Sequence, residues 1–61
     1  MTDVLLVEDR PDMAEWMRGV VMEAMPEAVI TLADTLRQAR TQLPAQEWSL
    51  LLADIGLPDG S

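Results

Sequence analysis

The sequence predicts an α/β fold in which three parallel strands alternate with two helices. Three apolar runs are too short for helices and rich in valine, leucine or isoleucine, which favours buried strands. The segment after the first run repeats its apolar residues at steps of three and four, the spacing of one helical face. A proline follows each helical segment. Such a βαβαβ order implies parallel pairing with right-handed crossovers.

We expect the first strand at about 4–7 and the first helix at about 11–25. The strand is apolar on successive residues, which indicates cover on both faces. Pro11 suits the first helical turn, and the acids Asp12 and Glu15 suit the positive end of the helix dipole. The residues expected in the core from this helix are Met13, Trp16, Met17, Val20 and Val21.

The second strand is expected at about 28–32, the second helix at about 34–43 and the third strand at about 48–53. Asp34 or Thr35 can cap the second helix. Trp48 is expected to cover the end of the core, whereas Arg37 and Arg40 are expected on a solvated helix face. The third strand reads as interior because its apolar residues are consecutive.

The composition limits the kinds of function that this chain can have. Its 61 residues allow one small domain, and the absence of cysteine and histidine leaves only oxygen ligands for a metal. Eleven acids against four arginines give a net charge of -7, which argues against direct contact with nucleic acid by this segment. We find no secretory signal pattern and no apolar run long enough for a bilayer, so we expect a cytoplasmic protein without membrane contact.

Acidic residues follow two of the predicted strands. Glu8 and Asp9 come after the first strand, and Asp54 comes directly after the third. Ligands of open parallel sheets bind beyond the carboxyl ends of the strands, so we expect these three carboxylates to lie close together. Mg²⁺ would relieve their mutual repulsion and bind phosphate oxygens as well. Asp54 could then attack phosphorus and form an acyl phosphate.

Simpler interpretations of the same acids remain open at this point. An acid pair after a short strand is often a solvated charge at a helix start, and an aspartate after a strand is often a turn residue. Without a resemblance to a known family, the pattern predicts only an acidic, metal-binding α/β segment.

Two stretches of the sequence resemble a known family. VLLVEDRPDMAEWM and LLLADIGLPDGS are similar to the first and third strands, with their following loops, of the receiver domains of two-component response regulators. The resemblance runs through the whole chain. It implies a truncated flavodoxin-like (CheY-like) doubly wound parallel sheet, βαβαβ of an expected (βα)5. Residues 1–61 would be the N-terminal part of one receiver domain, which is not an enzyme in its own right.

The resemblance also implies roles for single residues. Asp54 would be the phosphoacceptor and Asp9 a direct Mg²⁺ ligand, with Glu8 acting on the metal through water. Gly56 would lend its backbone carbonyl to the metal, although it also suits a plain turn. Pro58 and Gly60 match the loop punctuation of the family. The partner would be a histidine kinase or phosphotransfer protein, and the output a downstream process such as transcription.

The chain departs from the family in stopping about halfway, before the hydroxyl residue and the lysine that contact the phosphoryl group. We therefore expect a fragment whose third strand has an open edge, and such an edge invites pairing. The alternative function is assembly through that strand, with a complementary half or as a homodimer. A magnesium-dependent phosphatase is disfavoured, because Gly56 stands where that class has a second aspartate. A nucleotide site is disfavoured because no glycine-rich loop follows Val7.

Overall fold

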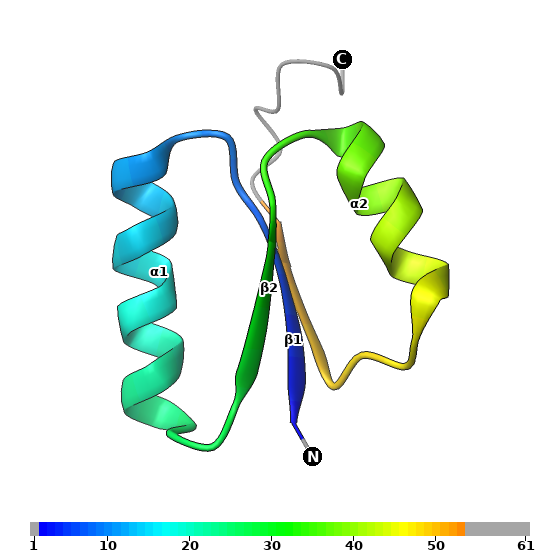
Figure 1. The fold of residues 1–61 in the computed structure, drawn as a ribbon. Helices are drawn as coiled ribbons and strands as arrows, with labels where there is room; N and C mark the ends of the chain where they lie inside the picture. The colour runs from blue at the N-terminus through cyan, green and yellow to red at the C-terminus, as the bar shows by residue number, and fades with distance from the viewer. Residues whose placement is uncertain (1, 54–61) are drawn as a thin grey trace.

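The computed structural model describes residues 2–53, which form a three-stranded parallel sheet flanked by two helices (Figure 1). Between residues 2 and 53 no helix has the length and apolar character of a membrane span. The elements, in chain order, are β1 (Asp3–Val7), α1 (Pro11–Ala24), β2 (Val29–Ala33), α2 (Leu36–Gln42), a single 3₁₀ turn (Leu43–Ala45) and β3 (Leu50–Ala53). The predicted α/β class and βαβαβ order are confirmed, and the strand order is β2-β1-β3.

Several element boundaries differ from those expected. The second strand runs Val29–Ala33 instead of 28–32, and the third begins at Leu50 instead of 48. The second helix begins at Leu36 because Thr35 stays extended as its N-cap, where the Thr35 hydroxyl oxygen accepts from the Gln38 N–H at 3.1 Å. It ends at Gln42, after which the chain tightens into the 3₁₀ turn that contains Pro44.

The two helices lie on opposite faces of the sheet (Figure 1). The chain steps from β1 to β2 in one direction and from β2 past β1 to β3 in the other. Two right-handed crossovers that step in opposite directions place their helices on opposite faces. The point between β1 and β3 is therefore the switch point of the sheet, and the carboxyl ends of all three strands lie at one end of the molecule.

The central strand β1 provides most of the core. Val4, Leu5, Leu6 and Val7 are between 0% and 2% exposed, which confirms a strand covered on both faces. On the α2 side, a cluster of buried residues is packed against Trp48, as predicted for that tryptophan. The cluster consists of Leu5, Val7, Ala33 and Ala39.

Helix α1 buries a narrower stripe than the sequence predicts. Ala14 and Val21 are each 5% exposed, but Trp16 is 65% and Val20 48% exposed, so the prediction that these two lie in the core is wrong for the described chain. The apolar positions of α1 extend around more of the helix than the small sheet covers. Trp16 and Val20 are four residues apart and therefore neighbours on the outer surface of the helix.

Strand β3 is an edge strand of the described sheet, not an interior one. Its only neighbour there is β1, and Leu50 and Leu51 are 36% and 47% exposed. The apolar run was read as interior because an apolar strand is usually covered on both sides. Within residues 2–53 the open edge that the resemblance implied is therefore present.

We expect the Trp48 indole to stabilise the fold through its N–H as well as through its ring. Its indole N–H donates to the carbonyl oxygens of Gln42 and Leu43, both at 3.1 Å, where α2 ends. Trp48→Phe keeps a ring for packing but removes the donor, so we expect the free energy of unfolding to fall by about 1 kcal/mol. Urea titration followed by circular dichroism measures it. The control, Trp16→Phe, changes an exposed ring and should stay within about 0.5 kcal/mol of wild type; equal losses in both variants would contradict the role of the indole.

Candidate functional site

Glu8 lies directly after β1 and is buried. The residue is only 1% exposed, so the interpretation of Glu8 as a solvated loop charge is wrong. The Glu8 backbone N–H donates to the Ala33 carbonyl at 2.9 Å, which continues the β1–β2 pairing one residue beyond the strand. The Arg10 backbone N–H donates to the Glu8 carboxylate oxygen Oε2 at 3.2 Å. Both the main chain and the carboxylate of Glu8 are thereby fixed in place.

The burial of this carboxylate is energetically unusual. Removing an ionised carboxylate from water costs several kcal/mol in order of magnitude unless hydrogen bonds or a cation offset the loss. Glu8 is the only charged or polar residue among the buried residues of the described chain. A position that only supports a turn could be filled by a smaller polar residue, so the presence of an acid at this buried position favours a role for its charge.

Asp9 provides a second carboxylate beside the first and is partly exposed. Asp9 is open to solvent in part, whereas Glu8 is buried. Such a pair, one buried and one accessible, suits Mg²⁺, which binds one or two carboxylates and keeps several water molecules. Glu8 and Asp9 are thus the residues of the described site that would hold the predicted metal.

The sheet register brings the end of β3 next to this acid pair. Val7 is the register partner of both Ala33 in β2 and Ala53 in β3. The residue that follows Ala53 in the sequence is Asp54. Asp54 and Gly56 lie outside the described residues, as do Pro58 and Gly60, so their predicted roles stay predictions. What the structure provides is the adjacent ends of β1 and β3 that those roles require.

Besides Glu8, Asp9 and Asp54, a further acid lies at this end of the sheet, and sequence reasoning did not count it as part of the site. Asp34 follows Ala33 at the carboxyl end of β2 and is exposed, with its backbone N–H donating to Gln38 Oε1 at 3.1 Å. The signal was present, because Asp34 follows an apolar strand in the same way as Glu8 and Asp54 do. It was interpreted only as a helix cap, and Thr35 takes that position. Asp34 lies on the β2 side of β1, away from the switch point.

No group of three acidic side chains that could hold a metal occurs within residues 2–53. Glu8 and Asp9 supply two carboxylates, and the third one that the sequence predicts is that of Asp54. The chemistry of the donor set fits Mg²⁺, because the ligands at this edge are oxygen atoms.

Charges near the start of α1 are arranged in exposed pairs. The Arg10 guanidinium lies 3.3 Å from the Asp12 carboxylate. The Met13 backbone N–H, and then the Arg10 charge, lower the pKa of Asp12 below its usual value. Both side chains of the pair are largely exposed, at 61% and 75%, so the pair contributes little to stability.

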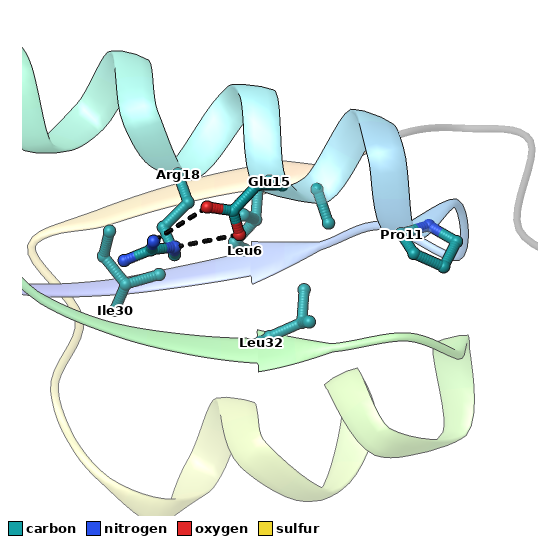
Figure 2. A pocket seen from close by; sticks show the side chains of 7 residues that line it. Leu6, Pro11, Glu15, Arg18, Ile30 and Leu32 are labelled. Atoms are coloured by element: carbon teal, nitrogen blue, oxygen red, sulfur yellow. Dashed lines mark hydrogen bonds and ion pairs between the residues drawn. The ribbon is translucent and has the colours of Figure 1, made fainter.

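A groove of about 290 Å³ lies between α1 and β2, at a different place from the acid pair (Figure 2). Apolar side chains, including those of Leu6, Ile30 and Leu32, line it, and the Glu15–Arg18 ion pair at 2.8 Å lies over them. Arg18 lowers the pKa of Glu15, and Glu15 raises that of Arg18. Because each charge is paired with the other, the described lining of this groove offers mainly apolar surface.

Comparison with family models, with curated proteins and with solved structures found no match to this chain. The features of the chain that indicate a function are the sheet, the buried Glu8 and the residues that follow the strands.

Proposed function

We propose that this chain is the phosphoacceptor receiver module of a two-component response regulator. In this proposal Asp54 accepts a phosphoryl group from a histidine kinase or phosphotransfer protein, with Mg²⁺ held by Glu8, Asp9, Asp54 and the Gly56 carbonyl. One observation carries the proposal: a carboxylate only 1% exposed follows the central strand, whose end adjoins that of the strand preceding Asp54.

The proposal extends to the complete fold and to the place where it works. The observed order β2-β1-β3, with one helix on each face, matches the first half of a flavodoxin-like sheet of order 2-1-3-4-5. We propose that the chain forms the N-terminal part of such a domain in the cytoplasm. The absence of lysine from these 61 residues means that a family-type lysine contact would have to come from outside them.

The chemistry assigned to the site is a single displacement. A carboxylate oxygen of Asp54 forms a bond to phosphorus while the phosphorus–nitrogen bond to the donor histidine breaks, and the histidine nitrogen leaves with the electron pair. Bound Mg²⁺ would offset the negative charge on the phosphoryl oxygens. Glu8 and Asp9 would hold and orient this cation. The added charge then shifts the complete domain between two conformations and so signals to an output such as transcription.

Incubation of the protein with Mg²⁺ and acetyl phosphate tests this function. We expect the intact mass to increase by one phosphoryl group, because the Asp54 carboxylate displaces acetate from phosphorus. Asp54→Asn should abolish the increase. Asp34→Asn is the matched control, since Asp34 also follows a strand of the same sheet but on the β2 side of β1, and it should be phosphorylated as the wild type is.

Two results would contradict the proposal. One is the lack of any mass increase in wild type, and the other is an increase that persists in Asp54→Asn. Chelation of Mg²⁺ should also stop the reaction, and phosphorylation that continues in excess chelator would contradict the role of the metal.

A second candidate function, in a different class, is assembly through β3. The specific observation is the edge position of β3 together with the exposed Leu50 and Leu51. A second copy of the chain could add its own β3 to this edge and extend the sheet, since an uncharged strand edge is a template for pairing. The net charge of -7 opposes close approach of two copies, so this function ranks below phosphoryl acceptance.

Sedimentation velocity over a range of protein concentrations tests the assembly function. The assembly function predicts that the wild type forms a dimer and that Leu51→Arg does not, because Leu51 is 47% exposed on β3. Leu43→Arg is the control, since Leu43 is similarly exposed at 43% but lies in the 3₁₀ turn after α2. Asp54→Asn should leave the dimer intact. A wild type that stays monomeric, or a dimer that survives Leu51→Arg, would exclude assembly through this edge.

A further inference from the structure

Arg10 lies at the candidate site but has no part in the function proposed above. It directly follows Glu8 and Asp9, and as the N-cap of α1 it has an extended backbone with φ -94° and ψ 117°. Its backbone N–H donates to Glu8 Oε2 at 3.2 Å. The main chain of Arg10 is thereby tied to the acid pair, while its side chain is 61% exposed to solvent.

The distribution of positive charge distinguishes Arg10 from the other basic residues. The sequence has four arginines and no lysine. Arg18 is held by two hydrogen bonds to Glu15, at 2.8 and 3.3 Å, over the groove between α1 and β2 (Figure 2). Arg37 and Arg40 belong to α2, on the other face of the sheet. Arg10 is therefore the arginine whose backbone the structure joins to the acid pair.

The Arg10 guanidinium is held only loosely by its acidic neighbour. A single contact of 3.3 Å joins it to Asp12, with both side chains largely exposed. Exposed pairs of this kind are worth roughly 0 to 1 kcal/mol, so the guanidinium can leave Asp12 for a stronger partner at little cost. The planar fork of its N–H groups matches two oxygens of a phosphoryl group.

A phosphoryl donor is an anion and meets repulsion at this end of the sheet. Glu8, Asp9 and Asp34 lie at the carboxyl ends of β1 and β2, and the whole chain carries -7. We propose that Arg10 binds the anionic phosphoryl donor as it arrives, with Asp12 competing for the guanidinium; this role rests on the proposed function. Arg10 keeps its proton throughout. With acetyl phosphate as the donor, an Asp54 carboxylate oxygen forms a bond to phosphorus while the bond from phosphorus to the acetate oxygen breaks.

The test measures the rate of phosphorylation against acetyl phosphate concentration at several ionic strengths. In Arg10→Gln we expect the donor concentration for half-maximal rate to rise about fivefold, with the limiting rate little changed, because an exposed charged contact is lost. The slowing of the reaction by added salt should weaken in the same variant. Asp12→Asn should shift the half-maximal concentration in the opposite direction by freeing the guanidinium.

Two variants are controls, one for the loss of a positive charge from α1 and one for the geometry of the guanidinium group. Arg18→Gln removes the same charge from α1 at the groove and should behave as wild type does. Arg10→Lys keeps the charge without the fork, so it should retain the salt dependence and recover part of the donor affinity. Circular dichroism of each variant should match wild type.

The possible outcomes separate the two proposals. A wild type that gains no phosphoryl group overturns the proposed function and the role of Arg10 with it. A wild type that is phosphorylated, with Arg10→Gln and Arg18→Gln equal in half-maximal concentration and salt dependence, overturns the role of Arg10 alone.

Discussion

The burial of β1 is the constraint on which the rest of this structure depends. Residues Val4–Val7 are at most 2% exposed because strands pair on both edges of β1 and helices cover both of its faces. This position requires α1 and α2 to lie on opposite faces, and it makes the end of β1 the switch point of the sheet. The residue that follows this strand is carried into the interior, and that residue is an acid, Glu8. Both the arrangement of the fold and the position of the candidate site thus depend on β1, a strand of five residues.

Much of the fold could be predicted because local signals agree with one another. Pro11 begins α1 and Thr35 caps α2, and the apolar runs form strands whose ends differ by one or two residues from those expected. The wrong predictions concern how far other helices and strands cover a given residue. Trp16 and Val20 fit the periodicity of a buried helical face. Periodicity does not show how much of that face the sheet covers, however, and both residues are exposed. Leu51 is exposed for the same reason, since an apolar run carries no information about neighbours across the sheet.

The candidate site was predictable in its residues but not in its physical state. Glu8 and Asp9 are found where parallel strand ends should place them, yet an acid after a strand is usually solvated, and only the structure reveals that Glu8 is 1% exposed. Asp34 was interpreted only as a possible helix cap, and Arg10 was not singled out from the sequence. The burial of a residue and its distance from other residues depend on tertiary contacts, which cannot be read from the pattern of residue types along the sequence.

The most direct test of the central claim, that buried Glu8 serves a metal, compares unfolding free energies with and without Mg²⁺ in wild type and Glu8→Gln. Without metal, Glu8→Gln should be at least as stable as wild type, because a neutral amide costs less to bury than a carboxylate. With Mg²⁺ the wild type should gain stability in proportion to metal occupancy, and Glu8→Gln should gain clearly less. An equal gain in both proteins, or a metal-free Glu8→Gln that is strongly destabilised, would contradict a metal role and leave Glu8 as a structural acid.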